Sequence, residues 1–296
     1  MKNSKRKNTS CFLFGIITFL GLVGLVIGWF WLTNSPQPSP LEKTLFRGVI
    51  YERDIRTQPR PMVIHILTID LKEQGIKFLV TPGDPEADLP LSARTTSKFL
   101  NSFNLQIAVN GDGFTPWHSN TIIDYYPHKG DPIDVIGFAS SKGVVYSEDT
   151  DNEPTLFISP TNQARINTQI GKIYNAISGN LQIVKNGRVI PGLSQVPEPR
   201  TVIALDRANR HLIIIVVDGR QPGYSDGATL KELAQIVIEK RGYNAINMDG
   251  GGSTTLVMED KLGIPKLLNR PINQRIPNNQ RPVGNHLGIY AKSLND

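Results

Sequence analysis

Three consecutive glycines, Gly250 to Gly252, constrain the fold of this chain more than any other feature of its sequence. Glycine loses more backbone entropy on folding than any other residue, so a run of three does not stabilise a helix or a strand. Such a run is tolerated where the backbone turns sharply or where another group approaches it closely. Nucleotide-binding glycine loops lead into a helix, but here β-branched residues that favour a strand follow Ser253. The segment therefore predicts either a tight hairpin connection or a site with Asn247 and Asp249 at its mouth.

The amino terminus has the pattern of a membrane anchor. Residues 1–11 contain four basic residues and predict a cytoplasmic tail, and residues 12–32 form an uncharged, apolar run. This length suits a membrane-spanning helix and exceeds the roughly 7–15 residues of a signal-peptide core. Basic residues on the amino-terminal side alone predict a single-pass protein with its domain on the extracytoplasmic side, periplasmic or extracellular. A cleaved, unusually long signal peptide is the alternative.

The remainder of the chain divides into a short linker and one domain. Residues 33–45 are rich in proline and predict a stiff linker, and residues 46–296 contain the expected globular domain. Four of the 32 Lys and Arg residues lie in the tail, so 28 remain against 26 Asp and Glu residues. The net charge of +6 therefore gives no basis for nucleic-acid binding. The only cysteine, Cys11, precedes the apolar run, so the exported part has no cysteine with which to form a disulfide.

Strand patterns outnumber helix patterns in the expected domain. The predicted strands are Met62–Asp70, Ile76–Val80, Gln106–Val109, Leu181–Ile190 with a turn at Asn186-Gly187, Thr201–Leu205 and Leu212–Val217. The last of these is apolar throughout and is expected in the middle of a sheet. Helices are predicted at Thr95–Asn101 and at Thr229–Arg241, the second with a Thr229–Glu232 capping box and with Gly242 at its end. The pattern predicts an α+β fold, with mixed β-sheets and a few flanking helices in a single globular domain.

Two polar segments between these elements are candidates for a site. Residues 115–134 form a long aromatic and polar stretch without a core pattern, and a loop of this length inside a domain tends to be functional. The sequence Asn-x-Asp-Gly follows an apolar strand twice, at Asn110–Gly113 and at Asn247–Gly250. These two strand ends are hypothesised to face one pocket.

Five short blocks of the sequence, taken in order, resemble the phosphodiester glycosidase family. The blocks are Ala108–Phe114, Pro199–Thr201, Val217–Arg220 with Gly223–Ser225 and Gly227–Thr229, Asn247–Ser253 and Arg281–Val283. The resemblance extends from about His65 to Tyr290. It implies hydrolysis of the bond between the anomeric carbon of a sugar and a phosphodiester oxygen, and the family includes bacterial relatives linked to exopolysaccharide.

This reaction requires a carboxylate beside the anomeric carbon and cations around the phosphate. A phosphate monoester has a second pKa of about 6, so a cationic clamp can replace the carboxylic acid that most glycosidases need. We assign Asp249 as general base or nucleophile. Asp218 is assigned to orient an arginine or a substrate hydroxyl, and Asn247 completes the catalytic set. Substrate and phosphate binding are assigned to Arg200, Arg220, Arg281, Asn110, Asp112, Gly250, Gly251, Ser253, Ser225 and Thr229. For Asp218 and Asp249 the alternative is turn chemistry, for a single arginine a solvated surface charge, and for Thr229 a helix cap.

One residue departs from the family pattern. Where the family has a second glycine after Asn110-Gly111, this chain has Asp112, and the added carboxylate raises the question of a divalent metal together with His118 and His128. Their spacing does not support such a site, and no cofactor is predicted. The expected partners are a carbohydrate phosphodiester and, through the amino-terminal helix, a membrane. The alternative function is a non-catalytic envelope protein that binds polysaccharide during assembly or export, which an Asp112 loop blocking the pocket would favour.

Overall fold

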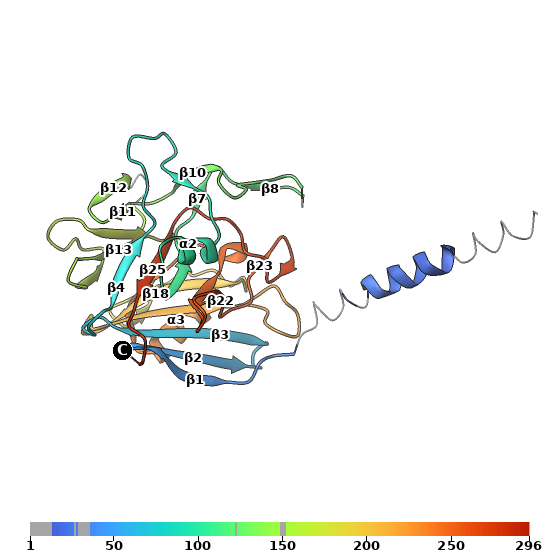
Figure 1. Cartoon of the computed structure of the whole chain (residues 1–296). Helices are drawn as coiled ribbons and strands as arrows, with labels where there is room; N and C mark the ends of the chain where they lie inside the picture. The colour runs from blue at the N-terminus through green and yellow to red at the C-terminus, as the bar shows by residue number, and fades with distance from the viewer. Residues whose placement is uncertain (1–13, 27, 29–35, 122, 149–151, 296) are drawn as a thin grey trace, which may run out of the picture.

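The computed structural model describes residues 14–26, 28, 36–121, 123–148 and 152–295 (Figure 1). Residues 14–26 are helical. Within the described ranges no helix is both long and apolar enough to cross a membrane. The predicted tail at residues 1–11 lies outside the described residues, and so does part of the predicted anchor at residues 12–32.

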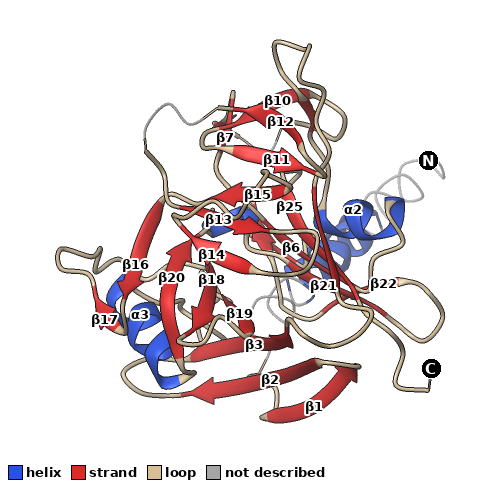
Figure 2. Cartoon of the chain, turned by 90° about the vertical axis from the view of Figure 1, so that its left-hand side faces the viewer, coloured by secondary structure: helices blue, strands red, loops and turns tan. Residues whose placement is uncertain are grey.

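The largest element of the domain is an eight-stranded sheet. Its strands, in spatial order, are β1 (Leu41–Phe46), β2 (Val49–Arg56), β3 (Met62–Asp70), β19 (His211–Val217), β18 (Arg200–Asp206), β20 (Gly242–Asn247), β16 (Leu181–Lys185) and β17 (Arg188–Val189). Each strand pairs antiparallel with its neighbours. The helix α3 (Leu230–Glu239) packs against β16 and β20 of this sheet, as Figure 2 shows.

Two five-stranded antiparallel sheets complete the main framework. One has the order β22 (Pro265–Leu267), β21 (Leu256–Glu259), β6 (Ile107–Asn110), β25 (His286–Tyr290) and β4 (Lys77–Val80), and helix α2 (Thr96–Ser102) packs on it. The other has the order β12 (Val144–Ser147), β11 (Ala139–Ser141), β15 (Asn175–Ser178), β13 (Thr155–Ile158) and β14 (Ala164–Ile166). The remaining short strands form three smaller sheets. One has the order β5 (Leu91–Ser92), β10 (Pro132–Val135) and β7 (Phe114–Thr115). The other two are pairs, β8 (His118–Ser119) with β9 (Tyr125–Tyr126) and β23 (Ile272–Asn273) with β24 (Ile276–Pro277).

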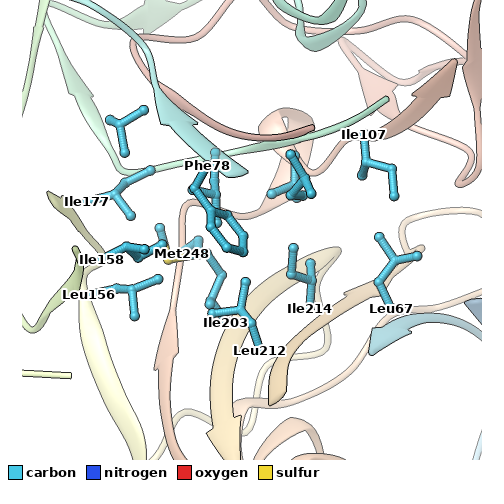
Figure 3. Packing of buried hydrophobic residues seen from close by; sticks show 14 of the residues in the cluster. Leu67, Phe78, Ile107, Leu156, Ile158, Ile177, Ile203, Leu212, Ile214 and Met248 are labelled. Atoms are coloured by element: carbon cyan, nitrogen blue, oxygen red, sulfur yellow. The ribbon is translucent and has the colours of Figure 1, made fainter. Parts of the chain in front are cut away.

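The main hydrophobic core lies between the large sheet and the two five-stranded sheets. Figure 3 shows side chains of the large sheet, among them Leu67, Ile203, Leu212 and Ile214, opposite Phe78, Ile107, Leu156, Ile158 and Ile177. The alternate residues of β19 face a second core under α3. This strand is therefore buried on both faces in the middle of the sheet, which confirms the expectation from its continuous apolar sequence.

The domain is a single, mostly β globular unit, and several details differ from the sequence predictions. The strand ladders are antiparallel, not mixed. Even β19 and β20, which α3 joins, do not pair with each other, because β18 lies between them and pairs antiparallel with both. Strand β1 begins at Leu41, inside the predicted linker. The stretch at residues 115–134 contains the short strands β8, β9 and part of β10. Helix α3 has the predicted capping box, but the residue in the left-handed region after it is Arg241 (φ 67°), not Gly242.

The register of the large sheet brings distant sequence segments to one edge. Arg200, the first residue of β18, pairs with Val217 at the end of β19, and Val202 pairs with Asn247 at the end of β20. Since β18 runs antiparallel to both neighbours, its beginning lies beside both of their carboxyl ends. The segments that carry Asp218 and Asp249 therefore leave the sheet at the same edge at which Arg200 enters it.

Candidate active site

A cavity of about 840 Å³ lies at this edge of the large sheet. Its walls come from the beginning of β18, the loops after β19 and β20, the segment after β7 and the β23–β24 hairpin. Seven of the predicted site residues line it: Asn247, Asp249, Gly250, Gly251, Arg200, Arg220 and Arg281. Residues 81 positions apart in the sequence thus meet in one cavity.

Each of the three glycines makes room for a neighbouring group. A Cβ atom on Gly250 would lie 2.8 Å from the carbonyl oxygen of Pro199. On Gly251 it would lie 3.0 Å from a guanidinium nitrogen of Arg220, and on Gly252 it would lie 2.5 Å from one of Arg281. The backbone turns here through a short 3₁₀ segment into β21, which belongs to another sheet. The hairpin interpretation is therefore wrong, and close approach of two arginines explains the glycine run.

Asp249 is the carboxylate that faces the cavity beside these glycines. Its backbone N–H donates to the carbonyl of Gly111 (3.0 Å), and its carbonyl accepts from Nδ2 of Asn110 (2.8 Å). Burial raises the pKa of Asp249, while a hydrogen bond from Ser253 and the charge of Arg281 act in the opposite direction. The two Asn-x-Asp-Gly loops therefore touch through their backbones, but only the second contributes its carboxylate to the cavity.

Arg281 contacts the aromatic segment after β7 as well as the residues around the glycine run. Its Nε donates to Oδ1 of Asn273 (3.1 Å) and its Nη1 donates to Oγ of Ser253 (3.3 Å). Its Cζ lies 5.3 Å from the ring centroid of Trp117, a cation–π contact. Burial lowers the pKa of Arg281, Asp249 raises it and Arg220 lowers it.

The other two predicted arginines are held by Glu198 and by backbone carbonyls. Arg220 is in the left-handed region (φ 57°), and its Nε donates to Oε2 of Glu198 (2.5 Å). Arg200 donates from Nε to the carbonyl of Ala228 (3.1 Å) and from Nη2 to that of Val196 (2.9 Å). Burial lowers the pKa of Arg200, Glu198 raises it and Arg220 lowers it. Burial and the positive charge of Arg220 thus disfavour the charged forms of Arg200 and Arg281. A bound anion would stabilise these charged forms.

Asp218, assigned to the catalytic set, does not line this cavity. It is fully buried, and its Oδ1 accepts from Nδ2 of Asn269 (3.0 Å) and from the N–H of Arg270 (2.9 Å). Its Oδ2 accepts from Tyr224 (3.1 Å) and interacts with Nε2 of His65 (3.0 Å). Asp218 therefore fastens the loops around the cavity together and does not itself face a substrate.

Five further predicted residues lie outside the cavity lining, and each has a structural partner: Asn110, Asp112, Ser253, Ser225 and Thr229. The Asn110 amide accepts from Thr201 Oγ1 (2.8 Å) and from the N–H of Thr255 (3.1 Å). Ser225 Oγ accepts from the N–H of Val63 (3.0 Å) and donates to the carbonyl of Asp218 (2.5 Å). Thr229 caps α3. Two of the five contact residues of the cavity: Ser253 contacts Asp249 and Arg281, and Asn110 donates to the backbone carbonyl of Asp249.

Asp112 is buried beside another carboxylate, Glu153, and does not line the cavity. Its carboxylate accepts from the N–H groups of Gly113 (2.7 Å) and Gly137 (2.9 Å). Burial and the neighbouring Glu153 raise the pKa of Asp112 well above its ordinary value. Across the described ranges no group of three or more His, Cys, Asp or Glu side chains is arranged to hold a metal ion.

Several residues of the cavity were not predicted from the sequence. Glu198 provides a second carboxylate, and Gln221, Asn180 and Arg275 add polar groups. Glu198 directly precedes the block Pro199–Thr201. This position was the only indication in the sequence that Glu198 belongs to the site. Trp117 lies in the aromatic stretch that was expected to be functional, and it now has a defined partner in Arg281.

Comparison with known proteins identifies the same segment of the chain. A family model described as phosphodiester glycosidase matches residues 103–290. Bovine N-acetylglucosamine-1-phosphodiester alpha-N-acetylglucosaminidase is 30% identical over 104 residues, which cover 29% of this chain and 19% of the bovine protein. The match thus spans about a fifth of the length of that relative.

Solved structures share the fold at low sequence identity. A hypothetical protein from Synechocystis aligns with a TM-score of 0.63 and 15% identity, over 86% of this chain and 64% of that one. The catalytic domain of the zebrafish N-acetylglucosamine-1-phosphodiester alpha-N-acetylglucosaminidase, auto-inhibited by its pro-peptide, aligns with a TM-score of 0.59 and 18% identity, over 88% of this chain and 86% of that one. A protein from Burkholderia pseudomallei, described as exported, aligns with a TM-score of 0.56 and 14% identity, over 77% of this chain and 74% of that one. The family model covers well over half of the chain, and all of the cavity arginines and carboxylates described above lie within the matched residues. The chain therefore belongs to the phosphodiester glycosidase family.

Proposed function

We propose that this chain hydrolyses the bond between the anomeric carbon of a sugar and the phosphate oxygen of a glycosyl phosphodiester. One observation carries the proposal: the carboxylate of Asp249 shares a cavity with the guanidinium groups of Arg220 and Arg281. These two groups lie against Gly251 and Gly252, respectively. A carboxylate and an arginine pair this close suit a substrate with an electrophilic carbon next to an anion.

The reaction places one role on each side of the substrate. Asp249 acts on the anomeric carbon, either by taking a proton from an attacking water or by forming a glycosyl ester that water then hydrolyses. In both routes the C1–O bond breaks and its electron pair stays on the phosphate oxygen, while water supplies OH to the carbon. The departing phosphate monoester gains negative charge, which the arginines stabilise.

The raised pKa of Asp249 supports this assignment. A carboxylate whose pKa lies above its ordinary value is a stronger base when ionised, and burial is the main cause of the shift here. The arginines oppose that shift in the free protein. When the phosphate binds, part of their positive charge is neutralised, so the carboxylate becomes still more basic as the substrate arrives.

An Asp112 loop that blocked the pocket would have favoured the non-catalytic alternative. Asp112 instead points to Glu153 and is absent from the cavity lining, while the cavity retains about 840 Å³. That volume is within the range of small-molecule sites, about 300–1,000 Å³. These observations favour an enzyme over a protein that only binds polysaccharide.

The proposal is tested by incubating the purified protein with a panel of sugar-1-phosphodiesters that differ in sugar and in the second ester group. We expect release of free sugar and phosphate monoester from at least one member, with loss of activity on substitution of Asp249. Binding of these compounds without any hydrolysis would support the non-catalytic alternative.

We further propose that the domain is held on the extracytoplasmic side of a membrane by the amino-terminal apolar run, and that the substrate is an exopolysaccharide or another envelope glycan. The support is the uncharged sequence of residues 12–32 with basic residues only before it. Gln37, in the segment that joins this run to the domain, donates to the carbonyl of Tyr224 (3.0 Å), two residues from Pro222 in the cavity wall. Protease added to spheroplasts is expected to degrade the domain, and protection from the protease would contradict this orientation.

A further inference from the structure

A second hollow, of about 610 Å³, adjoins the candidate active site. It lies between the loop before β13, the segment after β14 and strand β16. Five of its lining residues carry side-chain amides: Asn152, Asn167, Gln169, Asn180 and Gln182. We refer to this hollow as the amide trough.

The two cavities meet at Asn180, which lines both of them. Its Oδ1 accepts a hydrogen bond from Nδ2 of Asn247 (2.8 Å), and Asn247 lies two residues before Asp249. A Cβ atom on the preceding Gly179 would lie 2.5 Å from the carbonyl oxygen of Asn247, so this glycine allows the loop before β16 to pack against the end of β20. The N–H of Gly179 donates to the carbonyl of Pro154 (3.0 Å), which is part of the trough wall.

The two cavities differ in charge. Four arginines line the candidate active site, against the two carboxylates Glu198 and Asp249. The amide trough contains one charged residue of each sign, Glu153 and Lys185. An anionic group is therefore attracted to the first cavity, and the trough has no comparable preference for charge.

The chemistry of the trough suits a neutral, hydroxyl-rich ligand. An amide both donates and accepts hydrogen bonds, which matches the donor and acceptor character of sugar hydroxyls. The trough amides are already oriented: Asn167 donates from Nδ2 to Oε1 of Gln182 (3.2 Å), and its Oδ1 accepts from the N–H of Thr155 (2.9 Å). Partly exposed Phe157 and Leu181 add apolar surface for the C–H face of a sugar ring.

We propose that the amide trough binds a further neutral sugar residue, attached to the sugar whose anomeric carbon reacts. The order of groups along the chain supports this direction. Asp249 lies between Gly251 and Gly252, which the arginines approach, and Asn247, which donates to Asn180. With the phosphate on the arginines, the reacting sugar lies over Asp249 and Asn247, and its non-reducing side points to the trough. The inference rests on the proposed function for this orientation and names the substrate class as an oligomeric glycan phosphodiester.

The test compares substrate lengths in the full-length protein. The methyl phosphodiesters of a monosaccharide and of the matching trisaccharide are assayed with the wild type and with the double variant Gln169→Ala, Gln182→Ala. The matched control is Gln195→Ala, Gln235→Ala, which removes two glutamines from a separate hollow beside α3. We expect the wild type to prefer the trisaccharide, and the ratio of kcat/KM for trisaccharide over monosaccharide to fall about tenfold in the trough variant only, as two neutral hydrogen bonds would give.

Equal kcat/KM of the wild type on both lengths, or an unchanged ratio in the trough variant, would overturn the proposal. If the wild type hydrolyses neither ester, the proposed function fails and the trough is tested separately by titrating neutral, phosphate-free trisaccharides into labelled protein. Binding that is lost in the trough variant and kept in the control then supports the trough. Lack of binding by the wild type refutes it.

Discussion

Substitution of Gly252 by alanine tests whether the glycine run exists to admit Arg281. Gly252 does not adopt a positive φ, so its backbone accepts an alanine, unlike Gly251 at φ +59°. The added Cβ would lie 2.5 Å from Nη2, 2.7 Å from Cζ and 3.0 Å from Nε of Arg281. Ordinary contacts are about 3.5 Å or longer, so the guanidinium group must move by roughly 1 Å.

The size of the effect follows from this displacement. A charge-assisted contact to the phosphate contributes about 1.5–3 kcal/mol, and each 1.4 kcal/mol corresponds to about a tenfold change in rate. We therefore expect kcat/KM for a glycosyl phosphodiester to fall roughly 10- to 150-fold in Gly252→Ala. Stability should change by no more than about 1 kcal/mol, or about 2–4 °C in Tm, because the displaced group is the end of a flexible side chain at a cavity.

The assay is a double-mutant cycle on kcat/KM. If Gly252→Ala acts through Arg281, it lowers kcat/KM by a much smaller factor in an Arg281→Ala background than in the wild type. Gly113→Ala is the matched control, since its Cβ would lie 2.8 Å from the Cδ1 atom of Ile136, a flexible side chain that does not line the cavity. A Gly252→Ala variant with wild-type kcat/KM, or equal losses in both backgrounds, would refute the reasoning.

Three further outcomes follow from the structure. Asp112 should make stability depend on pH: burial beside Glu153 raises the pKa of Asp112, so its protonated form favours the folded state, and this stability is lost as pH rises from the ordinary value of 3.8 through the raised one. Asp112→Asn does not titrate, so its Tm should fall less than that of the wild type over this rise in pH, and an equal fall would contradict the sign. Arg220→Lys removes the planar group that pairs with Glu198 and should weaken transition-state binding by about 1–3 kcal/mol, which is measured as a fall in kcat/KM. Wild-type kcat/KM in this variant would contradict the expectation. Thr229→Ala should cost about 1 kcal/mol in urea unfolding through the lost capping box and leave kcat/KM unchanged; a kinetic defect in folded protein would return Thr229 to the site.

Local patterns in the sequence were sufficient to predict much of the fold. Strand β3 spans the predicted residues, and β19 lies in the middle of the large sheet as its apolar sequence indicated. The capping box of α3 was also predictable, because Thr229 and Glu232 are three residues apart and their interaction is local. Strand order was not, since pairs such as β3 with β19 join segments far apart in the chain.

The candidate site was predicted in part, for a similar reason. Asp218 and Asp249 both follow a buried strand and both precede glycine, so the sequence around them does not separate their positions. What separates them is distant: His65 and Asn269 fill the hydrogen-bonding positions of Asp218. Asp249 lines the cavity, and Asn110, 139 residues away, donates a hydrogen bond to its backbone carbonyl.

The catalytic claim for Asp249 is tested most directly by kcat and KM of Asp249→Asn on a hydrolysed phosphodiester. The substitution preserves size and removes the charge that acts on the anomeric carbon. We predict that kcat falls on the order of 10²- to 10⁴-fold, the usual contribution of a general base, while KM changes little and Tm stays within a few degrees of the wild type. A variant that retains wild-type kcat but unfolds at a lower temperature would contradict the account, because it would show that Asp249 only stabilises the turn before the glycines.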